Sequence, residues 1–284
     1  MPTLRAFCLA LAFFGLTALS APIQWLSIRC GWKLQKDYPH AYHRFLCRMF
    51  GIRLHVVGKP ITDRGVLMVA NHTGYFDILI MSAAAPVSFV AKAEVAGWPL
   101  FGLMARLQRS VFVDRARRAA AAESAAIIRR RLQQGDALVL FPEGTSTDGN
   151  HVIPFKSALM GAVESEVGKD AEGRTEYVPV QPVSIAYVGF HGIPLGRENR
   201  PFYAWYGDME LMPHVWEAFK TGPLDVVVEF HQPLKVGPGC GRKQIAVLAE
   251  NLARTGQIRA LQGDWGEGET LPAAGENATP GAPV

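Results

Sequence analysis

From about residue 52 to residue 261 the chain alternates short apolar runs with longer segments in which apolar residues recur at helical spacing. The apolar runs are nearly continuous aliphatic stretches, which is typical of strands covered on both faces. The predicted strands cover residues 53–58, 65–71, 87–92, 110–115, 136–141, 178–187 and 224–230, and the predicted helices cover residues 76–84, 99–107, 117–134, 155–166 and about 242–261. This alternation predicts an α/β fold with a mostly parallel sheet flanked by helices.

The most apolar part of the chain lies near its N-terminus. About 23 uncharged residues between Arg5 and Arg29 are enough to cross a hydrocarbon core of roughly 30 Å as a helix. Pro22 interrupts this run, and Trp25 is typical of an interfacial anchor. We expect a membrane-anchoring helix. Two alternatives remain open: a secretory signal cleaved near Ala21, and a helix that enters one leaflet without spanning.

The segment that follows, residues 29–50, mixes basic and aromatic residues at helical spacing. It is either an amphipathic helix lying on a membrane surface or a solvated helix packed on the domain. At the other end of the chain, Gly, Glu, Ala and Pro dominate, which predicts a disordered tail. The expected division is a membrane-anchoring segment over residues 1–50, a catalytic domain over 51–262 and a tail over 263–284.

Charge and cysteine content narrow the chemistry. The net charge of +4 is too small for a nucleic-acid-binding signature, and a weak attraction to anionic lipid headgroups fits it better. The four cysteines are scattered without a C-x-x-C pair, which indicates neither a zinc site nor a disulfide framework. We expect no metal and no cofactor.

The first candidate site is NHTGYFD, residues 71–77, which follows an apolar strand. It places His72 at the end of that strand and Asp77 in the first turn of the next helix, where α/β sheets locate their sites. A carboxylate beside a histidine orients the imidazole and stabilises the imidazolium that forms during general-base catalysis. Such a pair also arises by chance in ordinary loops. No G-x-S-x-G nucleophile motif occurs, so the attacking hydroxyl would belong to a substrate.

The second candidate site is ALVLFPEGTSTDGN, residues 137–150. An apolar strand leads into Glu143, Gly144 and Thr145, and the glycine allows backbone N–H groups to approach an anion. The same residue types also form ordinary turns. In a parallel sheet, however, this strand end would lie beside His72.

With these motifs in order, the chain resembles the glycerolipid acyltransferase family typified by 1-acylglycerol-3-phosphate acyltransferases. NHTGYFD matches the family's NHxxxxD motif, and FPEGTS (141–146) matches its FPEGTR-type motif. AKAEVAGWPLFG (91–102) with VFVDR (111–115), and later Val178 to Val183, match the two remaining blocks. The resemblance implies that His72 is the general base and Asp77 its orienter. It also implies substrate-binding roles for Glu143, Gly144, Thr145, Lys92 and Arg115.

One departure from the family pattern concerns the acceptor. The family usually has an arginine where this chain has Ser146. An arginine can bind a phosphate through two charge-assisted hydrogen bonds, so its loss should weaken the preference for a phosphate monoester. The wider sequence resembles a bacterial subgroup acting on lyso-ornithine lipid, an aminolipid without phosphate. Lys156 or Arg115 could still bind a phosphate, so lysophosphatidic acid remains the alternative acceptor.

The resemblance also implies the partners. The acyl donor would be acyl carrier protein or acyl-CoA, the acceptor a lysolipid, and the location the bacterial inner membrane with the catalytic domain on the cytoplasmic side. Two rival hypotheses are a lysolipid hydrolase that uses water as acceptor and a non-catalytic lipid-binding protein that kept the fold. No nucleic-acid partner is expected.

Overall fold

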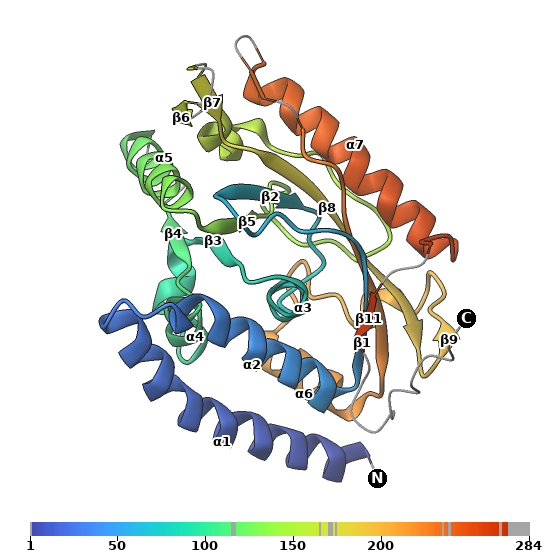
Figure 1. Ribbon diagram of the computed structural model, residues 1–284. Helices are drawn as coiled ribbons and strands as arrows, with labels where there is room; N and C mark the ends of the chain where they lie inside the picture. The colour runs from blue at the N-terminus through green and yellow to red at the C-terminus, as the bar shows by residue number, and fades with distance from the viewer. Residues whose placement is uncertain are drawn as a thin grey trace, which may run out of the picture.

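A computed structural model describes residues 2–114, 118–164, 166–169, 173, 175–234, 236–237, 240–266 and 269–271. A twisted sheet runs through the molecule, with α7 against one face and α2 and α3 against the other (Figure 1). The helices are α1 (Pro2–Arg29), α2 (Leu34–Phe50), α3 (Phe76–Ala84), α4 (Phe101–Leu107), α5 (Arg118–Gln133), α6 (Leu211–Lys220) and α7 (Arg242–Leu261), with short 3₁₀ helices η1 (Ala93–Gly97), η2 (Ser157–Glu164) and η3 (Arg200–Phe202).

The main sheet has the strand order β11-β1-β10-β8-β2-β5-β3-β4, and β9 pairs with β8. Its strands are β1 (Ile52–Gly58), β2 (Val66–Ala70), β3 (Ser88–Lys92), β4 (Val111–Val113), β5 (Ala137–Leu140), β8 (Val180–Phe190), β9 (Ile193–Pro194), β10 (Leu224–Phe230) and β11 (Glu269–Leu271). The pairs β1–β10, β8–β2, β2–β5, β5–β3 and β3–β4 are parallel, and the pairs β10–β8, β8–β9 and β1–β11 are antiparallel. A separate hairpin joins β6 (Glu166–Lys169) to β7 (Thr175–Tyr177). The predicted, mostly parallel sheet is confirmed.

The central strands are apolar on both faces because each face covers its own core. All five residues of β2 are buried. Met68 and Ala70 point into the core formed with α2 and α3, whereas Leu67 and Val69 point into the core formed with α5 and α7. This double burial explains the continuous aliphatic runs in the sequence.

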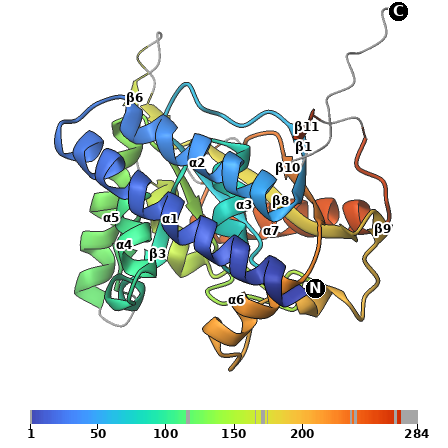
Figure 2. The ribbon, with the colours of Figure 1, turned by 90° about the horizontal axis from the view of Figure 1, so that it is seen from below.

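Helix α1 packs against the domain with polar residues of its second half and apolar residues of its first half. Thr17, Ser20, Gln24 and Ser27 are buried, and Leu9 and Phe13 pack against the core, whereas other large apolar side chains face outward. The exposed apolar residues of α1 are Leu4, Phe7, Leu11, Phe14, Leu19, Ile23, Trp25 and Leu26. Figure 2 shows α1 lying along α2 rather than standing away from the domain. By length and composition alone, α1 could cross a membrane.

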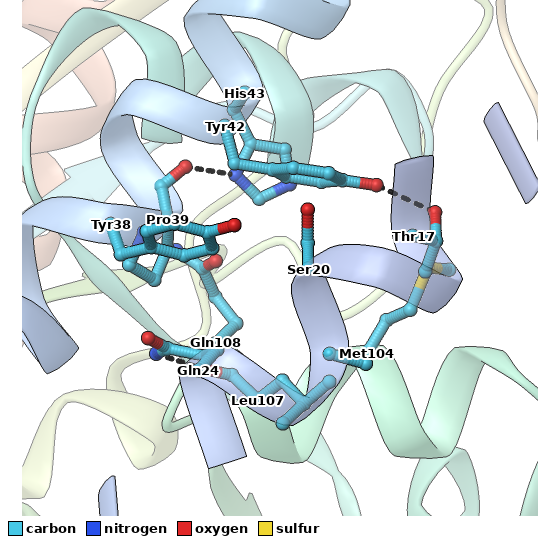
Figure 3. A pocket seen from close by; sticks show the side chains of 11 residues that line it. Thr17, Ser20, Gln24, Tyr38, Pro39, Tyr42, His43, Met104, Leu107 and Gln108 are labelled. Carbon is cyan, nitrogen blue, oxygen red and sulfur yellow. Dashed lines mark hydrogen bonds between the residues drawn. The ribbon is translucent and has the colours of Figure 1, made fainter. Parts of the chain in front are cut away.

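A small recess of about 60 Å³ lies between α1, α2 and α4, and polar groups of α1 face it. In Figure 3 the Ser20 hydroxyl points toward its centre, and the Tyr42 hydroxyl meets the Thr17 hydroxyl at 2.7 Å. The Gln24 side-chain amide donates to the backbone carbonyls of Gln35 at 3.1 Å and Leu107 at 2.8 Å. These hydrogen bonds and the packing of Phe13 against Phe50 and Phe219 together hold the helix to the domain.

The structure differs from the predicted elements in several places. Helix α1 continues through Pro22 without interruption, since a proline removes only one hydrogen bond and neighbouring helices support this turn. Part of the expected disordered tail, Glu269–Leu271, forms β11 beside β1. The segment expected as a helix over residues 155–166 is the 3₁₀ helix η2, and α6 was not predicted.

Candidate active site

The carboxyl ends of three neighbouring parallel strands meet at one edge of the sheet. There β2 leads into His72, β5 leads into Glu143, and β3 ends at Lys92. The two motif loops are joined directly, because the Thr147 backbone N–H donates to the His72 carbonyl at 2.9 Å and the Thr147 hydroxyl donates to it at 3.3 Å. The parallel register thus brings together the two sequence motifs as expected.

His72 and Asp77 form the hydrogen-bonded pair predicted from the sequence. The Nδ1 atom of His72 lies 2.7 Å from Oδ2 of Asp77. The same carboxylate oxygen accepts the backbone N–H groups of Thr73 at 2.6 Å and Gly74 at 3.1 Å, in the turn that opens α3. Asp77 is fully buried, so these donors replace the water that its charge would otherwise need. Because a carboxylate only accepts, Nδ1 carries the proton and Nε2 is left as the basic nitrogen.

The ring of His72 is fixed on a second side by stacking. Its centroid lies 4.1 Å from that of Phe141, with an interplanar angle of 16°. The side chain is 22% exposed. Within the described part of the chain no group is hydrogen-bonded to Nε2. The imidazole is therefore held at Nδ1 and across one face, and its Nε2 edge is available to a substrate.

Strand β8 supports the motif from beneath, through residues to which the sequence pattern gave no role. The Asn71 carboxamide donates to the Ile185 carbonyl at 2.9 Å and accepts the Ile185 N–H at 2.8 Å, as a backbone peptide group would. Two residues further along β8, the Tyr187 hydroxyl donates to Oδ1 of Asp77 at 2.7 Å. Tyr187 ends the predicted strand 178–187, but the alternation of a strand gives only its face, not its partner.

Glu143 lies beneath the site, not at its surface. Its side chain is fully buried, and neither carboxyl oxygen has a hydrogen-bond partner of good geometry among the described residues. Burial raises the pKa of Glu143 to about 9, and the nearby charge of Asp77 adds to the shift, although backbone N–H groups of His72 and Ile153 oppose it. At neutral pH Glu143 is thus a neutral acid. The substrate-binding role implied for Glu143 stays a prediction, and in this structure its carboxyl group faces the protein interior.

Within the FPEGTS motif, the turn after Glu143 is the part nearest to solvent. Gly144 has a φ of +73°, which a glycine adopts without strain, and its N–H donates to the Phe141 carbonyl at 3.3 Å. The Lys156 side chain crosses this turn, since a Cβ placed on Gly144 would lie 3.0 Å from Nζ. Thr145 is exposed beside it. This turn therefore offers a cation and a hydroxyl, whereas the N–H of Gly144 is already bonded.

Ser146 is tied to a loop that the sequence did not mark. Its hydroxyl donates a short hydrogen bond to the Trp205 carbonyl, and the Trp205 N–H donates to the Thr73 carbonyl at 3.0 Å. The approach is so close that a Cβ on Gly74 would lie 2.9 Å from the Trp205 nitrogen. The Trp205 loop therefore bonds to both motif loops, and no local pattern around Trp205 could have shown this.

The remaining predicted residues are placed as follows. Lys92 is exposed at the end of β3, on the same sheet edge as His72. Arg115 lies outside the described residues.

Among the residues that the structure describes, no group of three or more His, Cys, Asp or Glu side chains could hold a metal ion. The assembled groups are a base with its orienting carboxylate and a nearby cation, which suit proton removal from a hydroxyl.

Comparisons with known proteins agree with this chemistry. Residues 53–186 match the acyltransferase family. The chain is 43% identical to a lyso-ornithine lipid O-acyltransferase of Brucella abortus, over 92% of this chain and 97% of that protein. The corresponding protein of Rhizobium meliloti is 38% identical over 92% of this chain and 89% of its own length.

More distant relatives act on a different acceptor. A 1-acyl-sn-glycerol-3-phosphate acyltransferase of Neisseria meningitidis is 32% identical over 61% of this chain and 63% of its own length. The crystal structure of the 1-acyl-sn-glycerophosphate acyltransferase from Thermotoga maritima has a TM-score of 0.63 at 24% identity and covers 94% of this chain and all of that one. That likeness shows a shared fold.

The burial of Glu143 gives a testable pH dependence. Its folded-state pKa of about 9 lies above the ordinary value of 4.5, so the folded state keeps a proton that the unfolded state releases. The contribution of Glu143 to the free energy of unfolding should therefore fall as pH rises from about 4.5 to about 9. The neutral isostere Glu143→Gln should escape this loss, so its Tm advantage over the wild type should grow between pH 5 and pH 9.

Thermal unfolding of detergent-solubilised protein measures this effect. The matched surface variant Glu198→Gln, at an exposed position, should leave the pH dependence of the wild type unchanged. Glu143→Gln should also keep most of its activity. A tenfold rise in acceptor KM with an unchanged pH dependence of Tm would instead show that Glu143 binds substrate as a carboxylate.

Proposed function

This chain belongs to the acyltransferase family and is an enzyme that transfers acyl groups, and from that premise we propose that it acylates the hydroxyl of lyso-ornithine lipid with His72 as the general base. The observation that carries the mechanism is the 2.7 Å hydrogen bond between His72 Nδ1 and Asp77. It leaves Nε2 as the basic nitrogen, without a hydrogen-bond partner among the described residues, on a side chain that is 22% exposed. The acyl donor in this proposal is a thioester of acyl carrier protein or coenzyme A.

In the proposed reaction, Nε2 of His72 removes the proton from the acceptor hydroxyl while the oxygen attacks the thioester carbonyl. The tetrahedral intermediate then collapses, the carbon–sulfur bond breaks, and the thiolate takes the proton from the imidazolium. Asp77 stabilises the imidazolium between these steps. The reaction needs neither a metal nor a resident cofactor.

The developing oxyanion needs a donor, and the N–H of Gly144 is already bonded to Phe141. The Lys156 ammonium, which lies over Gly144, is the nearby cation on the exposed side of the turn. Stabilisation of this kind commonly contributes about 3 to 4 kcal/mol. We assign this role, or recognition of an anionic group on the acceptor, to Lys156.

The preference for lyso-ornithine lipid rests on the relatives and on Ser146. The relatives from Brucella abortus and Rhizobium meliloti, each matched over 92% of this chain, are lyso-ornithine lipid O-acyltransferases. The Ser146 hydroxyl is directed at the Trp205 carbonyl and adds no charge to the site. The Lys156 ammonium suits the single carboxylate of ornithine, whereas a phosphate dianion favours two or more positive donors.

The packing of α1 bears on how the enzyme meets the membrane. Arg5 donates to the carbonyls of Phe50 and Phe219 near the start of α1, and Gln24 donates to Gln35 and Leu107 near its end. A helix crossing the bilayer would lose these bonds, whereas a helix lying within one leaflet keeps them and immerses its outward apolar side. We therefore place α1 in the cytoplasmic leaflet of the inner membrane, with the catalytic domain on the cytoplasmic side.

Removal of the base should abolish the reaction. His72→Ala should lower kcat by about 10² to 10⁴ without loss of folding, and Asp77→Asn should also be strongly impaired because an amide at this position can favour the wrong tautomer. Radiolabelled acyl transfer to lyso-ornithine lipid measures this, with the exposed His191→Ala as the matched control at wild-type rate. Retention of more than a tenth of kcat in His72→Ala contradicts the assignment. Free fatty acid released equally with and without lysolipid would indicate a hydrolase.

Acceptor choice should respond to the charges around the Gly144 turn. The wild type should prefer lyso-ornithine lipid to lysophosphatidic acid, and Ser146→Arg should shift the kcat/KM ratio toward the phosphate acceptor by about 10- to 150-fold, the effect of one charge-assisted hydrogen bond. Lys156→Ala should weaken both acceptors, and the exposed Lys243→Ala should weaken neither. A wild-type preference for lysophosphatidic acid would overturn this part of the proposal.

Placement of α1 in one leaflet predicts a specific topology. Protein tagged at its N-terminus should sediment with membranes and resist carbonate extraction. The tag should stay protected from protease added to intact spheroplasts, because both ends of α1 face the cytoplasmic side. Cleavage of the tag under these conditions would show that α1 spans the bilayer. A mature chain beginning near Ala21 would show a signal peptide.

A further inference from the structure

The carboxylate of Asp77 has a fourth donor, and that donor comes from outside the motif. Oδ2 is shared by His72, Thr73 and Gly74, whereas Oδ1 accepts only the Tyr187 hydroxyl, at 2.7 Å, among the described residues. Tyr187 is 1% exposed. Its hydroxyl therefore reaches Asp77 without competition from bulk water.

The position of Tyr187 is determined by the way in which Asn71 extends the sheet. β2 pairs with β8 up to Ala70, opposite Val183, and the Asn71 carboxamide then continues the pairing at Ile185. Successive residues of a strand alternate between faces, so Tyr187 points to the same face as Ile185. On that face it lies among the residues packed against α3, directly beneath Asp77.

We propose that Tyr187 is a positioning residue that sets how strongly Asp77 holds and polarises His72. The inference rests on the proposed general-base role of His72. A phenol O–H that donates to one carboxylate oxygen withdraws charge from the other, so it weakens the pull of Oδ2 on the imidazolium. It also fixes the plane of the carboxylate, and with it the direction of the Nδ1–H bond.

The other acidic groups near Tyr187 and Glu143 do not compete with Asp77 as a free negative charge. Burial raises the pKa of the hydroxyl of Tyr75 and of the thiol of Cys47, both near Tyr187, and raises that of Glu143 to about 9. All three are neutral at pH 7. Burial also raises the pKa of Tyr187 itself, which keeps its hydroxyl a donor. Glu250, the remaining acid near Glu143, is paired with Arg254.

The first test removes only the hydroxyl. Tyr187→Phe should remain folded by thermal unfolding and lower kcat by about 10- to 100-fold, because the plane of the carboxylate and the direction of the Nδ1–H bond are no longer fixed, with little change in the KM of the acceptor. Without this donor, Asp77 should stabilise the imidazolium more strongly. The acid limb of the profile of kcat/KM against pH should therefore move to higher pH.

A second variant strengthens the same bond. Replacement of Tyr187 by 3-fluorotyrosine makes the phenol a better donor at nearly unchanged size, so the acid limb should move to lower pH. This opposite shift keeps the inference testable even if Tyr187→Phe does not fold. Tyr203→Phe is the matched control, because Tyr203 is also buried but its hydroxyl donates to the Gly222 carbonyl. Its rate and pH profile should equal those of the wild type.

Two results would overturn the inference. One is a Tyr187→Phe enzyme with kcat within twofold of the wild type. The other is a loss of rate with an unmoved pH profile in both Tyr187 variants, which would reveal a merely structural role. Neither result bears on the general base itself, which fails only if His72→Ala remains active.

Discussion

The buried carboxylate of Asp77 is the interaction on which the site depends. A charge without water must be matched by donors, and here these donors come from the imidazole, from two backbone N–H groups of the turn, and from Tyr187 on β8. Satisfying that one group fixes the start of α3, the tautomer of His72 and the distance between β8 and the motif loop. The loss of a single donor is therefore felt by all the others.

The parallel register of β2, β5 and β8 makes this arrangement possible. It brings the two motif loops to one edge, where Thr147 bonds to the His72 carbonyl and the Trp205 loop bonds to both motifs. The base is consequently held by backbone bonds as well as by its own side chain. Preorganisation of this kind spares the reaction the cost of ordering the base.

Strong local patterns predicted most of the fold and the central pair of residues. The apolar runs of β2 and β5 and the His72–Asp77 spacing were readable because each depends on a few adjacent residues. Tyr187 and Trp205 were not, since Tyr187 bonds to Asp77, 110 positions away, and Trp205 bonds to Ser146, 59 positions away. The buried position of Glu143 was missed for a different reason, because the residue type at a motif position does not show whether the side chain faces the protein interior.

The polar residues of α1 that bond to the domain also have a consequence for biosynthesis. Arg5 bonds to the carbonyl of Phe219, 214 residues further along the chain. At about 5 to 20 residues per second, roughly 10 to 40 s pass between synthesis of these two residues. During that interval α1 lacks some of the partners that satisfy its polar groups, while its apolar side is already exposed. A membrane surface can thus shelter the nascent helix during this interval, and the rest of the chain then folds onto a helix already in place.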